Sequence, residues 1–472
     1  MRLLPFQLFA AMLMLGAAAA QAAQPATVRV DYTHSGNALS DQYALERVVV
    51  EPLPWPGNLA KNFDNTNRGQ NRVEVVDART GDLLYSRDFS TVFGEWRTTE
   101  EAGKISRSFQ ESVRFPKPQQ PVRVRILKRD ERNQFSVAWS VEVDTDAQEV
   151  LKRQPPAPAR PIPIHVSGPS PEKVDLLILG DGYTQLEMKK FEADARRLSA
   201  HLFSVSPFRE RARDFNVWAM AVPTEQSGIT RPSTGVHHAS ALGTRYDIFG
   251  SERYVLTLDN RALREIAQHA SYEFIEILVN DRTYGGGGIF NDQATASVDS
   301  AFSPYVFVHE FGHHFAALAD EYYTSDVAYE TGSAGRPEPW EPNVTALRDP
   351  AGLKWKRHVK AGTPLPTPWP KAEYEEASRA YQSRRAALRA ANRPESEMNA
   401  LFREDLARSN ALFNKQPHRH TIGAFEGANY EASGYYRPAM QCLMFDRSET
   451  FCPVCQDGIS EIIDLYAGTA PR

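Results

Sequence analysis

The chain has 472 residues, which is too long for one ordinary hydrophobic core and favours two or three domains. Its content of 42% hydrophobic and 24% charged residues is typical of soluble globular proteins, and excludes wholesale disorder and a multi-span membrane protein. The formal net charge of −5 argues against a nucleic-acid partner.

The first 22 residues predict a secretory signal peptide. Arg2 precedes an apolar run, and Ala20-Gln21-Ala22 provides a small-x-small cleavage pattern. Pro5 and Gln7 interrupt the run, which is short for a bilayer span, so an uncleaved membrane anchor is the less favoured alternative. We therefore expect an exported protein, periplasmic or secreted, with no stable membrane span after cleavage.

Residues 23–150 predict an all-β sandwich domain. Short alternating or β-branched runs are separated by turn-forming residues, such as those at 77–82, and no long segment has the helical period. The runs lie at 27–32, 72–76, 122–127 and 135–143.

A proline-rich linker is expected at 151–172. Within it, the stretch QPPAPARPIPIHVSGPSP at 154–171 contains prolines that disfavour both a helix and a central strand. Such a composition predicts a stiff, extended connection between two domains.

Residues 173–472 predict a second domain of the α/β (α+β) class. A continuous apolar run at 174–179 is typical of a buried strand, and an amphipathic segment follows at 186–202. Strands alternating with helices continue along the chain. The further strands are expected at 215–222 and 274–279, the further helices at 261–270 and 304–318, and a solvated helical insertion at about 371–414.

The sequence HEFGHHFAALADEYY at 309–323 contains a zinc-binding H-E-x-x-H motif. His309 and His313 are four residues apart, so on a helix their imidazoles share one face and can bind the same zinc ion. Glu310 follows directly and can act as general base toward the attacking water. We expect one Zn²⁺ per chain at this motif.

The third zinc ligand is less obvious. Catalytic zinc usually has three protein ligands, and in the metzincin pattern a histidine would stand at 319 after a glycine at 316. Both positions are alanine here. Asp320, one residue later, is the preferred ligand if the helix unwinds after Leu318. Alternatively, Asp320 orients a ligand histidine and another carboxylate binds the metal. The candidates for that carboxylate are Glu321, Glu330 and Glu338.

The remaining histidines offer no ligand-spaced pair for the metal. His314 points about 100° away from His313 on a helix and is expected to be packed. Cys442, Cys452 and Cys455 are the only cysteines. In an exported protein they allow at most one disulfide and leave an odd thiol.

Several short motifs stand beside HEFGHHFAALADEYY: FGEW at 93–96, VD at 174–175, DGYT at 181–184, YGGGG at 284–288, GYYRP at 434–438, CLM at 442–444 and FCPVC at 451–455. With these motifs, the chain resembles the M64 metallopeptidases, a family best known for cleaving immunoglobulin A. The resemblance implies a secreted zinc endopeptidase that acts on protein or peptide substrates. It also implies a β-sandwich domain ahead of a metzincin-like catalytic domain.

The resemblance also implies roles near the zinc. Met444 looks like the methionine of a Met-turn beneath the metal, although a plain core methionine is the alternative. The glycines at 285–288 are expected to line the cleft, or else to form a flexible surface loop. Phe445 replaces the tyrosine that follows this methionine in many metzincins. A transition-state phenol would then come from Tyr322, Tyr323, Tyr435 or Tyr436.

The sequence thus favours a zinc metalloendopeptidase in which His309, His313 and Asp320 bind Zn²⁺ and Glu310 is the catalytic base. Two alternatives remain open at this point. One is an exported non-catalytic binding or adhesin protein with a structural zinc. The other is a zinc amidase that acts on cell-wall peptides.

Overall fold

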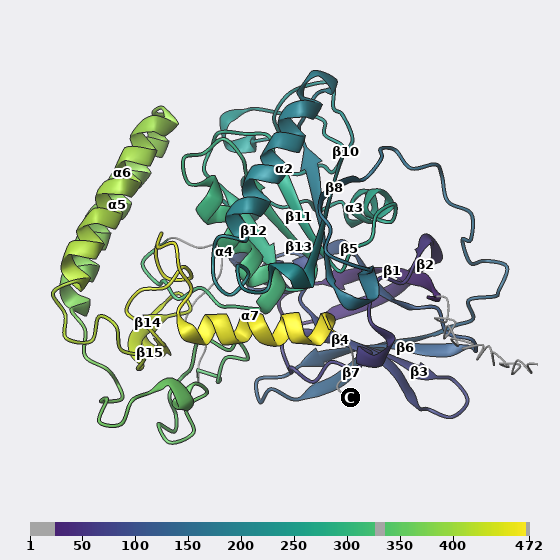
Figure 1. Cartoon of the computed structure of the whole chain (residues 1–472), viewed down its shortest axis with the longest axis horizontal. Coiled ribbons are helices and arrows are strands. Elements are labelled where there is room, and N and C mark those ends of the chain that lie inside the picture. The colour runs from purple at the N-terminus through teal and green to yellow at the C-terminus, as the bar shows by residue number, and fades with distance from the viewer. Residues whose placement is uncertain (1–23, 326–335, 469–472) are drawn as a thin grey trace, which may run out of the picture.

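The computed structural model describes residues 24–325 and 336–468, with an N-terminal all-β region followed by a mixed α/β domain (Figure 1). The predicted signal peptide and Glu330 lie outside the described residues. Among the residues that are described, no helix has both the length and the apolar character needed to cross a membrane.

The N-terminal region consists of two antiparallel sheets that share one apolar core. Inward-facing side chains alternate along their strands, as Val28 and Val30 do in one sheet and Val73 and Val75 in the other. The first sheet has the order β2-β1-β5, with β1 (Ala26–Gly36), β2 (Asp41–Pro54) and β5 (Arg107–Pro116). The second has the order β4-β3-β6-β7, with β3 (Asn71–Asp77), β4 (Leu83–Phe89), β6 (Val122–Arg129) and β7 (Phe135–Val143).

The α/β domain is built on a six-stranded sheet of order β12-β13-β11-β9-β10-β8. Its four central strands are parallel and its two edge strands are antiparallel to their neighbours. Every residue of β9 is buried, which explains the continuous apolar run there. The strands are β8 (Ile162–His165), β9 (Val174–Asp181), β10 (Phe215–Ala221), β11 (Phe274–Val279), β12 (Gly286–Ile289) and β13 (Gln293–Ser297).

Helices cover both faces of this sheet (Figure 1). On one face α2 (Met188–Leu202), α4 (Ser303–Ala316) and α7 (Pro453–Tyr466) share a core with Leu176 and Ile178 of β9. On the other, α3 (Asn260–Ala267) packs its Leu263 against Leu177 and Ile275. The helix α4, which carries the H-E-x-x-H motif, is therefore held rigidly between the sheet and α7.

Two sequence predictions need correction. Part of the predicted linker, Ile162–His165, is the edge strand β8, which is compatible with its Pro163 because an edge strand can omit a ladder hydrogen bond. The segment predicted as a solvated helical insertion does form helices, α5 (Lys371–Ala390) and α6 (Glu395–Phe413), at the margin of the molecule, and only its solvation needs correction (Figure 1). One face of this pair is buried, since Tyr381 and Phe402 are 7% and 0% exposed.

A short hairpin completes the domain. Its strands, β14 (Phe425–Ala428) and β15 (Glu431–Arg437), are joined by Asn429 and Tyr430. Both linking residues have positive φ angles, 52° and 63°. A tyrosine rarely adopts this backbone conformation, so the turn holds Tyr430 in a strained conformation.

Candidate metal centre and cleft

The end of α4 sets the geometry of the site. The helix stops at Ala316, and Ala317 adopts the left-handed conformation with φ 54° and ψ 36°. The N–H groups of Ala317 and Leu318 donate to the carbonyls of His313 and Gly312. The chain then turns back along the helix, so that Asp320 faces the two histidines. The helix therefore ends two residues earlier than the predicted Leu318.

Three ligand-type atoms meet at this point. The Nε2 atoms of His309 and His313 lie 3.2 Å apart, and Asp320 Oδ1 lies 3.1 and 3.3 Å from them. Tetrahedral zinc with ligands at about 2.0–2.1 Å separates those ligands by about 3.3 Å. The three groups thus fit the spacing of a zinc site, and the Glu310 carboxylate lies within 4.8 Å of both imidazoles.

Hydrogen bonds on the far side of each imidazole fix its orientation. His313 Nδ1 donates to the Leu318 carbonyl at 2.5 Å, and His309 Nδ1 lies 3.1 Å from the Leu443 carbonyl. The hydroxyl of Tyr305 is 3.2 Å from the same nitrogen of His309. A proton on Nδ1 leaves the Nε2 lone pair free to face the centre, as metal-binding histidines require.

Asp320 is held by the turn between β14 and β15. The Tyr430 hydroxyl donates to Asp320 Oδ2, and the backbone N–H of Asn429 donates to the Asp320 carbonyl at 3.0 Å. The other carboxylate oxygen, Oδ1, is buried and faces the two imidazole Nε2 atoms at 3.1 and 3.3 Å. Burial of such an oxygen is unfavourable unless a proton or a cation lies beside it, so this atom also fits a metal ligand.

The electrostatics of the cluster favour a cation. Burial lowers the pKa of His313, but Asp320 more than reverses this effect and raises the pKa to about 9. A proton is thus retained between the imidazoles and the carboxylate where no metal is bound. A divalent cation would displace that proton, since histidine binds metals in its neutral form. Burial also raises the pKa of Glu310.

The glycines of β12 pack against α4. A Cβ on Gly286 would lie 2.9 Å from the Glu310 Cγ, and a Cβ on Gly288 would overlap the Glu310 carbonyl oxygen. The other edge of the strand is met by Val255, whose N–H donates to the Gly286 carbonyl at 3.0 Å. The segment is therefore a buried edge strand that borders the cleft, and the surface-loop alternative is wrong.

The cluster opens into a cleft of about 400 Å³. Besides the residues around α4, two other parts of the chain form its walls. The N-terminal region contributes Gln70 and Glu95, and the α5–α6 pair contributes Ser378 and Tyr381. Neither part was predicted to line the site. FGEW at 93–96 is a motif of the family resemblance, and its Glu95 lies in the cleft.

Among the four tyrosines considered from the sequence, Tyr322 is best placed. Its ring stacks near His309 with centroids 6.3 Å apart, and its hydroxyl accepts a hydrogen bond from Arg253 at 3.2 Å. The hydroxyl of Tyr323 instead donates to Glu375, and that of Tyr435 donates to the Pro337 carbonyl. Tyr436 does not line the cleft. Tyr430, which the sequence analysis missed, contacts Asp320.

Met444 packs against α4 at Gly312. Its sulfur would be 3.1 Å from a Cβ on Gly312, and the methionine is fully buried. The neighbouring Leu443 supplies the carbonyl that orients His309. The segment around Met444 therefore packs against the histidine helix and orients His309.

The other candidate ligands lie elsewhere. Glu321 is turned away from the histidines, and its carboxylate contacts Cys455. Glu338 accepts a hydrogen bond from the N–H of Ala346 and pairs with Lys354. His314 is packed between strands, with Nδ1 2.9 Å from the Ile289 carbonyl, and burial lowers its pKa to about 3. Among these described candidates, Asp320 is therefore the carboxylate that lies beside the two imidazoles.

The three cysteines are free. The sulfurs of Cys442 and Cys455 lie 3.6 Å apart, well beyond the S–S bond length of about 2.05 Å. The disulfide allowed by the sequence analysis is therefore not formed.

Comparisons with known proteins agree with this geometry. A family model described as IgA Peptidase M64 matches residues 162–463, which include the sheet, α4, the β14–β15 hairpin and α7. A second model, described as Peptidase M64 N-terminus, matches residues 20–140. No curated protein matches the chain.

Proposed function

Since the chain belongs to the M64 peptidase family, whose members are metallopeptidases, we propose that it is an exported zinc-dependent endopeptidase that hydrolyses peptide bonds in proteins. The observation that carries the proposal is the convergence of His309, His313 and Asp320 on one point at the base of an open cleft. Structural zinc sites are usually closed by four protein ligands, whereas catalytic sites keep one position open.

In this proposal His309, His313 and Asp320 hold one Zn²⁺. When bound, zinc would polarise a substrate carbonyl and make a water molecule more acidic. The protein's part is to present the three ligands in a fixed arrangement. The Leu443 and Leu318 carbonyls orient the imidazoles, and the Tyr430 hydroxyl orients the carboxylate.

Glu310 is the proposed general base. Its carboxylate lies beside both imidazoles and at the cleft, where it can take a proton from the attacking water. It then gives that proton to the nitrogen of the leaving amine as the peptide bond breaks. Burial raises the pKa of Glu310, which helps the carboxyl group hold the proton between these two steps.

Tyr322 and Arg253 are proposed to stabilise the negative charge that develops on the carbonyl oxygen. The Tyr322 hydroxyl lies in the cleft and accepts from Arg253, which places both groups at the wall where a substrate oxygen would lie. Hydrogen-bond donors fixed in place before the reaction are among the largest contributions to such catalysis.

The fold supports a metzincin-like catalytic domain preceded by a β-sandwich. The edge strand β12 borders the cleft, the chain turns at Ala317 after the histidine helix, and Met444 packs against that helix.

Export is proposed from the signal sequence at 1–22. Sequencing the N-terminus of protein recovered outside the cytoplasm should show cleavage after Ala22, and an intact Met1 would contradict it.

The proposed chemistry is tested by the Glu310→Gln variant of the zinc-loaded protein. We expect it to keep its zinc and to lose about 10²- to 10⁴-fold in kcat for cleavage of a protein such as casein. Glu404→Gln, an exposed glutamate with 58% side-chain exposure, is the matched control and should keep full activity. Undiminished proteolysis by Glu310→Gln would refute the role of this carboxylate.

A further inference from the structure

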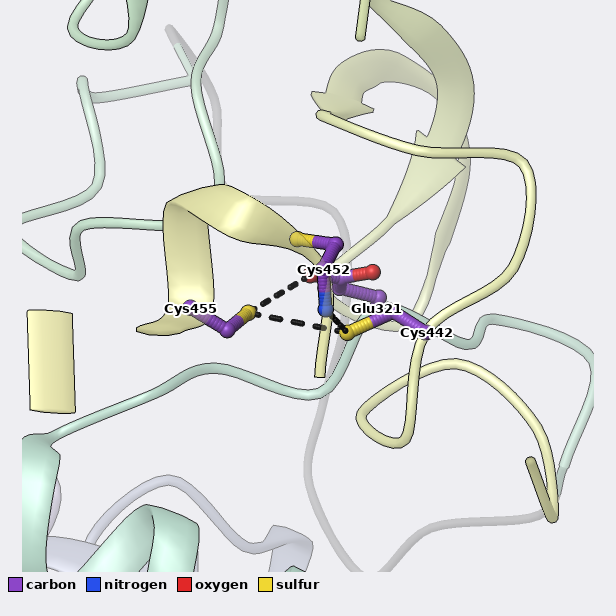
Figure 2. A group of neighbouring side chains, drawn as sticks. All are labelled: Glu321, Cys442, Cys452 and Cys455. Atoms are coloured by element: carbon purple, nitrogen blue, oxygen red, sulfur yellow. Dashed lines mark hydrogen bonds between the residues drawn. The ribbon is translucent and has the colours of Figure 1, made fainter. Parts of the chain in front are cut away.

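A second cluster of metal-ligand side chains lies behind the catalytic cleft. It consists of Glu321, Cys442, Cys452 and Cys455, whose ligand atoms all lie within 4.8 Å of one another. All four residues are buried, with at most 5% exposure. Figure 2 shows them gathered where the start of α7 meets the segments that carry Glu321 and Cys442. None of the catalytic steps uses this cluster.

The spacing within the cluster suits a tetrahedral ion. Cys442 and Cys455 sulfurs are 3.6 Å apart, and Cys455 Sγ is 3.3 Å from Glu321 Oε1 (Figure 2). Around tetrahedral zinc, with Zn–S of about 2.3 Å, neighbouring sulfurs lie about 3.8 Å apart. Cys452 and Cys455 also have the C-x-x-C spacing that recurs in structural zinc sites.

One carboxylate oxygen of the cluster lacks a hydrogen-bond partner among the described residues. Glu321 Oε2 is buried without a hydrogen-bond partner among the described residues, and Oε1 accepts from Asn343 at 3.0 Å. A fully buried carboxylate beside three thiols is unfavourable unless a cation faces it. No lysine or arginine forms an ion pair with Glu321 in the described part of the chain.

The backbone around the cluster presents stabilising groups to the sulfurs, although burial by itself raises the pKa of the Cys442 and Cys455 thiols. Cys452 stands at the N-cap of α7, and Cys455 lies in the first turn of the same helix. The N–H of Cys452 points at the Cys442 sulfur, 3.3 Å away. Backbone N–H groups and the positive end of a helix dipole both stabilise negative sulfur.

A buried cation lies close by. The guanidinium of Arg437 stacks on Phe445 and Trp369, and its charge acts on Glu321. Its Nε and Nη2 have no hydrogen-bond partner among the described residues. Zinc with three thiolates and a carboxylate carries net negative charge, which this guanidinium would partly offset.

From these observations we propose a second, structural Zn²⁺ site formed by Glu321, Cys442, Cys452 and Cys455. The thiols bind as thiolates and release their protons to solvent. Four protein ligands close the site, in contrast to the open catalytic site. The ion would tie together three segments: the chain just after Asp320, the segment before Met444 and the start of α7. It would thereby hold the back of the catalytic site in place.

The site can be tested separately from the catalytic one. In the full-length His309→Ala/His313→Ala protein, purified anaerobically with zinc and without chelator, we expect about one zinc per chain. X-ray absorption at the zinc edge should show sulfur ligands at about 2.3 Å. Absence of zinc, or zinc bound only by nitrogen and oxygen, would overturn the proposal. So would a Cys442–Cys455 or Cys452–Cys455 disulfide in the purified protein.

Substitution of the carboxylate provides the second arm. Loss of a group that merely orients a ligand lowers metal affinity by about 10- to 100-fold, so Glu321→Gln should lower zinc affinity in the double-histidine background by at least that factor. Glu338→Gln is the control and should bind zinc normally. Both variants keep all three thiols, and the folding of each is checked separately from its zinc affinity. Equal affinity in the two variants would remove Glu321 from the site.

The outcome does not depend on the proposed peptidase activity. If the double-histidine protein retains thiolate-bound zinc but Glu310→Gln remains fully active, the structural site stands and the proposed mechanism fails. If the double-histidine protein retains no zinc but Glu310→Gln is inactive, the structural site fails and the proposed mechanism stands.

Discussion

Ala317 is the residue at which the chain leaves the histidine helix and turns toward Asp320. It is an alanine in a left-handed conformation, which costs a residue with a Cβ about 1–2 kcal/mol relative to glycine. In the metzincin pattern the glycine stands one residue earlier, and the third ligand also stands one residue earlier. Here both the turn and the predicted ligand come one residue later, so the spacing between them is the same as in that pattern.

This conformation predicts that Ala317→Gly is tolerated. The relief of strain exceeds the added flexibility of the unfolded chain, so the free energy of unfolding should rise by up to about 1 kcal/mol. Ala316→Gly is the matched control, because Ala316 is helical and glycine there should lower stability by about 0.5–1 kcal/mol. Denaturant unfolding measures both changes. Equal destabilisation by the two variants would contradict the role of the turn.

Tyr430 contacts Asp320, so in the proposed zinc site it would act on the metal only through that carboxylate. Its hydroxyl donates a hydrogen bond to Asp320 Oδ2. Tyr430→Phe should therefore lower zinc affinity at the proposed catalytic site by about 10- to 100-fold without unfolding the protein. Chelator competition in the Cys442→Ser/Cys455→Ser background isolates this site. Tyr435→Phe removes a hydroxyl that donates to the Pro337 carbonyl instead, and should leave zinc affinity unchanged. Identical affinities would exclude Tyr430 as a positioning residue.

At the scale of elements, the contact between β12 and α4 determines where the histidine helix lies. Gly286 and Gly288 bring the strand against the backbone and side chain of Glu310. A side chain on this face of the strand would push the helix away from the sheet. The glycines are therefore required for packing as well as for access to the cleft.

Gly288→Ala should be destabilising by about 1–3 kcal/mol and should reduce proteolysis, because its Cβ would overlap the Glu310 carbonyl oxygen and approach His313. Gly103→Ala is the control, since a Cβ there meets nothing within 4 Å. Thermal unfolding and casein cleavage of the two variants make the comparison. A Gly288→Ala protein as stable and active as Gly103→Ala would show that the strand can move aside.

At the scale of the whole molecule, the N-terminal region is part of the peptidase and not a separate appendage. Arg68 is only 3% exposed, and its guanidinium donates to the carbonyls of Ala316 and Gly458 at 2.9 Å. It thereby caps the end of α4 and contacts α7, while Gln70 and Glu95 line the cleft.

Arg68→Ala should accordingly weaken the α/β domain although Arg68 lies outside it. Loss of charged hydrogen bonds to two buried carbonyls is expected to lower the free energy of unfolding by about 2–4 kcal/mol and to lower kcat. Arg132→Ala, at an exposed position in the same region, is the control. If both variants unfold at the same temperature, Arg68 does not join the two regions energetically.

Much of this molecule could be predicted from local pattern. Contiguous apolar or alternating runs located β7 and β11, and the four-residue spacing placed His309 and His313 on one helix face. Asp320 stays a predicted ligand, which its position a short loop beyond the helix suggested. The structure places Asp320 beside the imidazoles and Glu321 beside Cys455, a difference that sequence could not give because adjacent carboxylates point to opposite sides.

Features that depend on contacts between distant segments could not be predicted. Tyr430 reaches Asp320 from a hairpin 110 residues later, and Arg68 reaches Ala316 from 248 residues earlier. The buried face of α5–α6 was hidden because its aromatic residues are spread among many charged ones. The edge strand at 162–165 was hidden by its proline.

The central claim is that one zinc ion is held by His309, His313 and Asp320 at the base of the cleft. Anomalous diffraction at the zinc edge, from crystals of the zinc-loaded protein, tests it most directly. We predict a peak about 2.0–2.2 Å from both Nε2 atoms and from Asp320 Oδ1. A peak bound by a different carboxylate, or no peak between these histidines, would contradict the account.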